Sequence, residues 1–203
     1  MLCVVIMAGG LGSRLGYVCK PLLKICNKPL IQYIIEKVNN LGRVYVALSL
    51  RYRELKKWCI ENDIEYIVTS GEDYVKDLNY ILKIANVPTL ILPSDVPFIK
   101  RRTLRSFINI AQEIESNIAE LVFLLDDYVE IMGEKPDVTI NDMYVPSGIS
   151  LFKKVPKDYE ELSWKSIIYP YSLEFLNVNT FWHLKLSQDV CKWCYEEETE
   201  NDN

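Results

Sequence analysis

The chain has 203 residues, of which 49% are hydrophobic and 25% charged, and its formal net charge is −5 at pH 7. This size and composition predict one globular domain with a full hydrophobic core. The negative charge argues against a nucleic-acid-binding surface, and no apolar run approaches the roughly 18 residues that a transmembrane helix needs. Because a strand begins almost at once, without a basic leader, no signal peptide is expected and the protein is expected to be cytoplasmic.

Apolar runs alternate with helical patterns as far as residue 125. The patterns predict strands at residues 4–7, 44–48, 66–69, 89–92 and 121–125, and helices at residues 30–41, 53–62, 74–84 and 102–114. Gly42 is placed to close the first helix and Asp73 to cap the third. Fully apolar strands in this order predict a parallel, doubly wound α/β sheet. Its ligands are expected at the edge where the strands end.

The loop after the first strand is rich in glycine between residues 9 and 16 and carries Arg14, with Lys20 just beyond it. Glycines let the backbone turn tightly and approach a ligand closely. Loop N–H groups ahead of a helix bind anions, and the two cations add the positive charge that a triphosphate needs. A glycine cluster alone is about as often an ordinary turn beside solvated cations.

Two common phosphate-binding motifs do not fit this loop. A Walker loop needs Lys and then Ser or Thr after its last glycine, but Tyr17 and Val18 follow Gly16. The dinucleotide fingerprint reads G-x-G-x-x-G, whereas the spacing from Gly10 is G-x-G-x-x-x-G. The remaining string is A-G-G-x-G-x-R-L-G, then K-P-L and N-K-P-L. It resembles the signature of nucleotidyltransferases with a Rossmann-like fold, the molybdenum-cofactor guanylyltransferase-like and sugar-phosphate enzymes.

The resemblance implies a Rossmann-like, doubly wound, mostly parallel sheet of the nucleotide-diphospho-sugar transferase type. A single domain over residues 1–195 is expected, and the acidic tail, residues 196–203, is expected to be disordered. Arg14, Lys20 and Asp95 are the implied catalytic residues. The implied nucleotide-binding residues are Ala8, Gly9, Gly10, Leu11, Gly12, Ser13, Arg14, Lys20, Thr69, Ser70, Gly71, Asp77, Ser94 and Asp95.

Asp95 follows the fourth predicted strand, in the segment P-S-D-V-P-F. It stands too far ahead of the helix that begins near Arg102 to be its cap, and two prolines fix the loop around it. In the enzymes that the chain resembles, the Asp of such a segment holds the divalent metal that bridges the nucleotide phosphates. A hard carboxylate oxygen suits Mg²⁺. The resemblance therefore implies a metal ligand here, and a structural Asp is the alternative.

The segment L-N-V-N-T near the C-terminus resembles the [D/N]-x-[D/N]-T segment that returns a second oxygen to the metal. Asn179 takes the ligand position, with Asn177 beside it. The chain continues F-W-H-L where the family often has P-E-D-L, and a neutral amide binds a cation more weakly than a carboxylate does. The alternative is an Asn-rich turn before a helix.

Three further segments are expected to lie beside the substrates. Residues 69–71 are expected near the nucleobase, and Asp77 is either part of that pocket or an ordinary first-turn helix residue. Gly148 is expected to let the acceptor phosphate approach closely, and residues 126–146 to form an irregular insertion or hairpin over the second substrate. His183 is expected to be structural, because an ionised phosphate acceptor needs no general base and positioning with charge neutralisation carries the catalysis.

Within the family, the segments S-G-x-x-Y-V-x-D-L-N and P-S-D-V-P-F most resemble the archaeal GTP:adenosylcobinamide-phosphate guanylyltransferases. The implied partners are GTP and adenosylcobinamide phosphate, joined with release of pyrophosphate during cobalamin coenzyme biosynthesis. The alternatives are a molybdopterin or sugar-phosphate nucleotidyltransferase, and a nucleotide-binding regulatory subunit without activity. The presence of Arg14, Lys20 and Asp95 together favours an enzyme. Base selectivity and oligomeric state do not follow from the residues.

Six cysteines are scattered along the chain, and Cys191 and Cys194 form a C-x-x-C pair. No second pair at zinc spacing accompanies it, so a structural place in a C-terminal helix is favoured over metal or redox use. Cys19 and Cys26 flank the expected site. In a cytosolic α/β chain, all six are expected to be free thiols.

Overall fold

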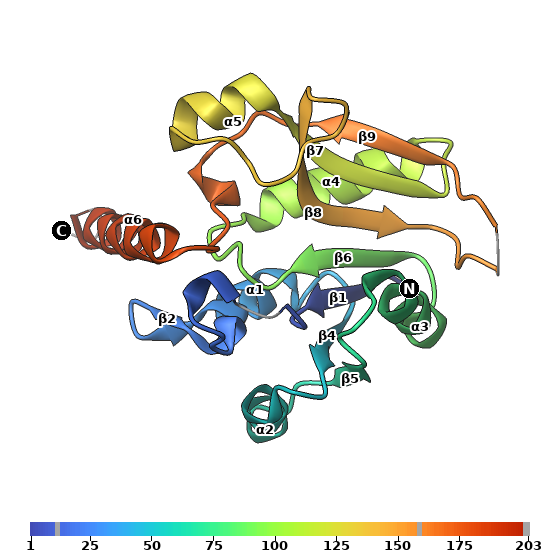
Figure 1. Ribbon diagram of the computed structural model, residues 1–203, viewed down its shortest axis with the longest axis horizontal. Coiled ribbons are helices and arrows are strands. Elements are labelled where there is room, and N and C mark those ends of the chain that lie inside the picture. Colours follow the sequence, from blue (N-terminus) through green and yellow to red (C-terminus); the bar gives the residue numbers. More distant parts are fainter. Residues whose placement is uncertain (11–12, 158–159, 201–203) are drawn as a thin grey trace.

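The computed structural model describes residues 1–10, 13–157 and 160–200, and Figure 1 shows its arrangement. The strands of the main sheet are β1 (Cys3–Met7), β4 (Arg43–Ser49), β5 (Tyr66–Thr69), β6 (Thr89–Pro93), β7 (Ile118–Leu124), β8 (Tyr144–Phe152) and β9 (Trp164–Ile168). A small hairpin pairs β2 (Lys24–Ile25) with β3 (Lys28–Pro29). The helices are α1 (Leu30–Val38), α2 (Arg53–Glu61), α3 (Tyr74–Ala85), α4 (Arg101–Glu113), α5 (Leu125–Met132) and α6 (Phe181–Glu200). Short 3-10 turns cover Ser13–Leu15, Lys20–Leu22 and Leu173–Phe175.

The main sheet has the order β5-β4-β1-β6-β8-β7-β9. Neighbouring strands are parallel except at β8, which runs antiparallel to both β6 and β7. After β1 the chain adds β4 and β5 on one side, then crosses back to place β6 on the other. The winding direction therefore reverses between β1 and β6, and ligands of open α/β sheets bind at such a point. The predicted doubly wound, mostly parallel sheet is confirmed.

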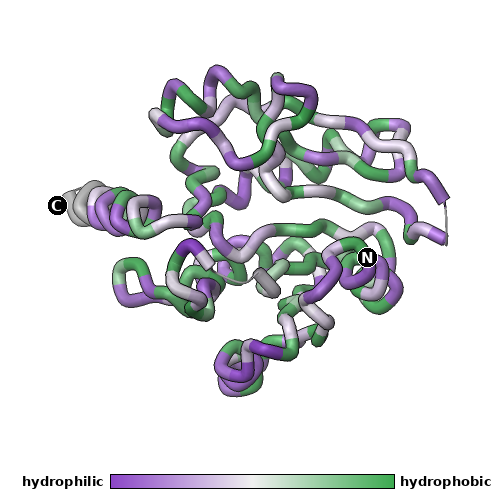
Figure 2. The backbone as a smooth tube through the Cα atoms, in the orientation of Figure 1, coloured by the Kyte–Doolittle hydropathy of each residue, from purple (hydrophilic) through white to green (hydrophobic). Residues whose placement is uncertain are grey.

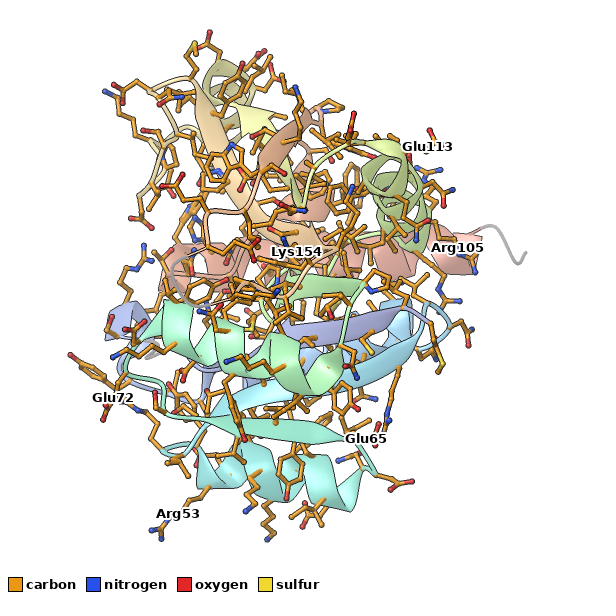
Figure 3. All side chains as sticks on the ribbon, turned by 90° about the vertical axis from the view of Figure 1, so that its right-hand side faces the viewer. Arg53, Glu65, Glu72, Arg105, Glu113 and Lys154 are labelled. Carbon is orange, nitrogen blue, oxygen red and sulfur yellow. A yellow bond between two sulfur atoms is a disulfide. The ribbon has the colours of Figure 1, made fainter. Side chains whose placement is uncertain are left out.

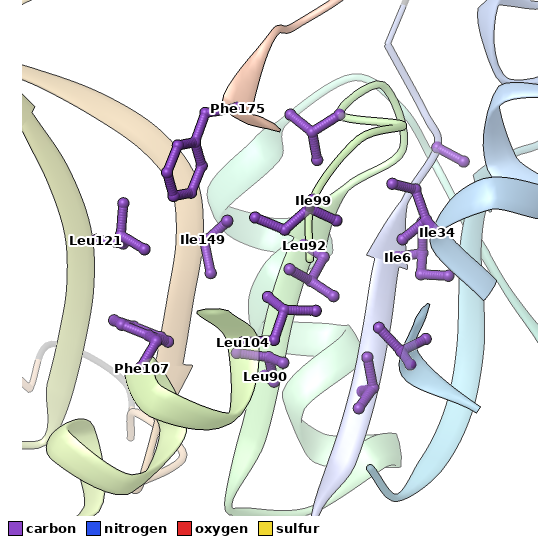
Figure 4. Close-up of a cluster of buried hydrophobic side chains, with 14 of the residues drawn as sticks. Ile6, Ile34, Leu90, Leu92, Ile99, Leu104, Phe107, Leu121, Ile149 and Phe175 are labelled. Carbon is purple, nitrogen blue, oxygen red and sulfur yellow. The ribbon is translucent and has the colours of Figure 1, made fainter. Parts of the chain in front are cut away.

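Alternate residues of the central strands face opposite layers. In β1, Val4 and Ile6 belong to the larger core with residues of α1, α2 and α4, whereas Val5 faces the smaller core beneath α3. Figure 2 shows hydrophobic colour along the central strands and mixed colour along the helices, and charged side chains such as Glu113 project outward in Figure 3. Figure 4 shows the larger core, where Ile6 and Leu92 meet helix residues. Each fully buried Ile or Leu contributes about 1.5–3 kcal/mol, so the strands that carry the site are firmly anchored.

Two predicted helix ends had different outcomes. Asp73 caps α3 as expected, because its carboxylate accepts from the N–H groups of Val75 and Lys76. Gly42 does not cap α1, which ends at Val38. A Cβ at Gly42 would lie 2.0 Å from the carbonyl oxygen of Leu2. The glycine therefore permits close approach of the N-terminal segment.

Residues 126–132 were expected to be irregular, and this was wrong. They belong to α5, which begins directly after β7 and ends at Met132, followed by Gly133 in a left-handed conformation with φ 69°. Asp126 and Asp127 lie in its first turn, where negative charge stabilises a helix. The irregular part is confined to the segment between α5 and β8. At the C-terminus, the backbone of residues 196–200 continues α6 where disorder was expected, and residues 201–203 lie outside the described residues.

The expectation of six free thiols was also wrong. Cys26, in the β2–β3 hairpin, forms a disulfide with Cys191 of α6, and their Cα atoms are 6.4 Å apart. The hairpin and α6 share a small core with Val178 and Tyr33, and they lie side by side in Figure 1. A separation of 165 residues leaves no local sequence signal for this pairing. None of the described helices combines the length and apolar character that crossing a membrane requires.

Candidate functional site

Three segments meet where β1 and β6 end. Ala8 follows β1 and donates its N–H to Ala47 O at 2.8 Å, and Ser94 follows β6 and donates to Met7 O at 3.2 Å. The segment before α6 joins them, because Val178 N–H donates to Asp95 O at 2.9 Å. The topology thus brings the glycine loop, the P-S-D-V-P-F segment and the L-N-V-N-T segment to one edge of the sheet.

Lys20, Asp95 and Asn179 form the centre of this site. The Lys20 ammonium is paired with Asp95 Oδ2 and donates to Asn179 Oδ1 at 2.8 Å. The side chains of Lys20 and Asp95 are only 16% and 9% exposed, so little water screens the pair. A cation therefore already lies between the two groups that were predicted to bind metal.

The donor atoms fit a magnesium ion that is shared with a substrate. Within residues 1–10, 13–157 and 160–200, Asp95 Oδ1 is buried without a hydrogen-bond partner, and no three His, Cys, Asp or Glu side chains gather as a metal-binding group. Mg²⁺ typically takes one or two protein carboxylates together with phosphate oxygens and waters. One carboxylate and one amide agree with such a shared ion and not with a closed protein cage. Metal binding by Asp95 and Asn179 stays a prediction.

The glycine loop begins at the end of β1. Ala8 is buried, and Gly9 and Gly10 line a cavity beside the strand end. Tyr52, at the start of α2, donates its hydroxyl to Gly10 O at 2.5 Å. This anchor was missed, because nothing in the sequence links α2 to the loop. Leu11 and Gly12, both predicted to bind nucleotide, lie outside the described residues. Ser13 starts the 3-10 turn that carries Arg14.

Arg14 contacts a different carboxylate from the one that Lys20 contacts. Its guanidinium pairs with Asp137, in the segment between α5 and β8. Both side chains are half exposed or more, and exposed ion pairs of this kind contribute about 0–1 kcal/mol. A triphosphate could therefore exchange for Asp137 at little cost. Sequence reasoning missed Asp137 because it lies 123 residues from Arg14.

The cavity beside Gly9 and Gly10 has a volume of about 370 Å³. Thr69, Gly71, Glu72, Tyr74 and Asp77 form its other wall. This wall runs from the end of β5 to the first turns of α3. Its predicted contact with the nucleobase stays a prediction.

Asp77 builds this wall. Its carboxylate accepts from Ser70 N–H at 3.0 Å, from Ser70 Oγ at 2.8 Å and from Gly71 N–H at 2.8 Å. Burial opposes ionisation, but these hydrogen bonds outweigh it and lower the pKa of Asp77. Gly71 has φ +72°, and a Cβ there would lie 2.6 Å from Ser49 Cβ. Asp77 therefore holds a turn that only glycine fits.

A second cavity, of about 190 Å³, has Asn179 in its lining. Its lining includes Phe123, Tyr128, Tyr171 and Phe175, together with Asp137. The cavity thus has aromatic and aliphatic walls, with the polar groups of Asn177 and Asn179 where it meets the Lys20 cluster. Its wall includes residues of the segment 126–146, which was expected to cover the second substrate.

Gly148 lies in β8 with φ +75°, and a Cβ there would lie 3.5 Å from the side chain of Pro93. It is near the end of β6, and its neighbours Pro146 and Ser147 line the second cavity. Its predicted contact with the acceptor phosphate stays a prediction.

The cysteines beside the site are not activated. Burial, with a contribution from Glu54, raises the pKa of Cys19 to about 12. A thiol with this pKa is neutral near pH 7 and is a poor nucleophile or metal ligand. Cys26 is held in its disulfide.

Comparisons with known proteins agree with this geometry. Residues 4–124 match the family model of the MobA-like NTP transferase domain. The adenosylcobinamide-phosphate guanylyltransferase of Methanocaldococcus jannaschii is 31% identical over 92% of this chain and 96% of its own length.

Two solved structures share the fold. HddC from Yersinia pseudotuberculosis, complexed with GMP-PN, has a TM-score of 0.68 at 17% identity and covers 93% of this chain and 99% of its own. Molybdopterin-guanine dinucleotide biosynthesis protein A from Archaeoglobus fulgidus has a TM-score of 0.67 at 16% identity and covers 95% of this chain and 99% of its own. With the glycine loop, the Lys20 cluster and the two cavities in place, this chain belongs to the MobA-like NTP transferase family of nucleotidyltransferases.

Proposed function

We propose that the protein transfers GMP from GTP to adenosylcobinamide phosphate, giving adenosylcobinamide-GDP and pyrophosphate. The observation that carries the proposal is the Lys20–Asp95–Asn179 cluster, which reaches one cavity through Asn179 and lies at the same sheet edge as the cavity beside Gly9 and Gly10. One cavity continues from the glycine loop and suits a nucleoside. The other, of about 190 Å³, carries aromatic side chains and suits contact with part of a larger acceptor. The choice of acceptor rests on the similarity to the adenosylcobinamide-phosphate guanylyltransferase of Methanocaldococcus jannaschii.

The reaction joins an oxygen of the acceptor phosphate to the α-phosphorus of GTP and breaks the bond from that phosphorus to the bridging oxygen of pyrophosphate. The acceptor is an ionised phosphate, so no protein group has to remove a proton. Catalysis then depends on orienting the two phosphates in line and on neutralising their charge. The Lys20 ammonium is well suited to both, because its side chain is largely buried and is held between Asp95 and Asn179.

Asp95 and Asn179 would hold Mg²⁺, which neutralises charge on the phosphates when it is bound. Lys20 would then exchange its carboxylate partner for phosphate oxygens. Arg14 would leave Asp137 and bind the β- and γ-phosphates, where a planar guanidinium forms paired hydrogen bonds.

Glu72 supports guanine as the base. It lines the nucleoside cavity, and Figure 3 shows it at the surface. Guanine presents N1–H and N2–H donors on one edge, and a carboxylate accepts such a pair. Adenine lacks this pair of donors.

Calorimetric titration with GTP, ATP, CTP and UTP tests the nucleotide half, and pyrophosphate release with adenosylcobinamide phosphate tests the acceptor half. GTP should bind best, and release should need both substrates and Mg²⁺. Release with a sugar 1-phosphate or molybdopterin in place of the corrinoid would overturn the acceptor assignment. GTP binding without turnover would instead indicate a regulatory subunit.

A further inference from the structure

His183 is the chain's single histidine, and the reaction described above leaves it without a role. It lies in the first turn of α6, and its side chain is 6% exposed. Thr180 Oγ1 accepts from the backbone N–H of His183 at 3.1 Å and fixes the start of the helix. A buried imidazole normally has hydrogen-bond partners at both nitrogens, and this ring has two.

Those partners define one tautomer. The backbone N–H of Asn179 donates to His183 Nδ1 at 3.3 Å. A nitrogen that accepts carries no proton, so the ring proton is on Nε2. His183 Nε2–H therefore donates to Glu134 Oε1, 2.9 Å away. The ring therefore bridges Asn179 and Glu134 in one defined direction.

The bridge connects two parts of the site. On one side is Asn179, whose amide oxygen accepts from Lys20. On the other is Glu134, two residues ahead of Pro136, which together with Asp137 and Val138 lines the second cavity. Asp137, in the same segment, pairs with Arg14. The wall of the acceptor cavity is thus joined to the Lys20 cluster through the imidazole.

Asn179 needs this support because it lies in neither a helix nor a strand. Its segment is held to the sheet edge by the bond from Val178 N–H to Asp95 O, and the bond to His183 is the anchor of Asn179's own backbone. Displacement of a positioned group by about 1 Å lowers turnover by up to about 100-fold.

We infer that His183 is a positioning residue, which places Asn179 against Lys20 and is itself oriented by Glu134. The inference rests on the proposed transfer reaction. Two substitutions separate positioning from packing. His183→Asn sets an amide oxygen near the place of Nδ1 but is too short to reach Glu134. His183→Gln reaches Glu134 but leaves the N–H of Asn179 without an acceptor.

His183→Gln should lower kcat about tenfold or more, with the KM for GTP changed less than threefold, whereas His183→Asn should retain at least about one third of kcat. Ser187→Ala is the matched control, because Ser187 is fully buried in the same helix and makes no hydrogen bond through its side chain within the described residues. It should keep wild-type kcat. Equal losses in both His183 variants, or losses that follow thermal stability, would contradict a positioning role.

A second measurement does not depend on activity. With one histidine in the chain, the imidazole ¹⁵N spectrum at pH 8 has a single origin. It should show the proton on Nε2, and Glu134→Ala should weaken that preference. A proton on Nδ1 in the wild type would refute the bridge. If the spectrum agrees but the wild type transfers no GMP, the proposed function fails and the bridge remains.

Discussion

Replacing Lys20 by Met removes the ammonium from between Asp95 and Asn179 and leaves a buried carboxylate without a counter-charge. The Asp95 side chain is 9% exposed, so water compensates little. Breaking a buried pair in this way costs about 3–5 kcal/mol. Because Lys20 itself is 16% exposed, we expect the low end, about 3 kcal/mol, which lowers Tm by about 6–12 °C in a domain of this size.

Urea unfolding measures the loss in free energy of unfolding. An m-value unchanged from the wild type, in Lys20→Met and in its control, shows that each variant unfolds from the same compact state. Lys28→Met is the control: Lys28 pairs with Glu36 at the surface, so it should cost less than about 1 kcal/mol. Lys20→Met combined with Asp95→Asn should recover most of the loss, because no charge is then left buried.

Repeating the unfolding measurement with Mg²⁺ gives a second test of the cluster. The variant without the ammonium should gain more stability from Mg²⁺ than the wild type gains, because the ion takes the place of Lys20 between the same oxygens. A Lys20→Met variant as stable as the surface control, or a double variant that loses the sum of both single losses, would refute the account of the cluster.

Three further predictions concern the cavity walls and the cysteines. Gly71→Ala should lower the free energy of unfolding by about 2–4 kcal/mol, because of strain at φ +72° and overlap with Ser49. Gly133→Ala is the control: the site has open space, so the loss should be about 1 kcal/mol. Equal losses in urea unfolding would contradict this prediction. The pKa of Asp77 is lowered from its ordinary value of 3.8, so the ionised carboxylate stabilises the fold above that pH, and this stability is lost as the pH falls through the lower folded pKa. Asp77→Asn should therefore flatten acid unfolding curves below that pH, and a curve as steep as the wild type's would argue against the turn. With a pKa of about 12, Cys19 should resist iodoacetamide at pH 8.5 until the protein unfolds, and rapid labelling of the native protein would show that the thiol is not buried.

Much of the fold could be predicted because short-range patterns in the sequence determine it. Apolar strand runs and Asp73 ahead of α3 reflect local burial and capping, and each lies within a few residues of its cause. The end of α1 was predicted wrongly because the glycine at position 42 is needed for its close approach to Leu2, which is a tertiary contact. The helix at Leu125–Met132 was missed because its charged first turn was taken for a polar loop.

The candidate site was predictable to the extent that its residues follow strands. The positions after β1 and β6 must meet at one edge, so Lys20 and Asp95 could be expected to come together. Pairs that join distant surface segments could not: Arg14 with Asp137, and Cys26 with Cys191. Their partners are set by how α5 and α6 pack, which no local spacing records.

Transfer of label from [α-³²P]GTP tests the central claim most directly. With Mg²⁺ and adenosylcobinamide phosphate, label should appear in the corrinoid in a one-to-one ratio with released pyrophosphate, and Asp95→Asn should abolish both. Label that ends in free GMP, or γ-phosphate that is released as orthophosphate with no labelled corrinoid, would contradict guanylyl transfer and show that the Lys20 cluster serves another reaction.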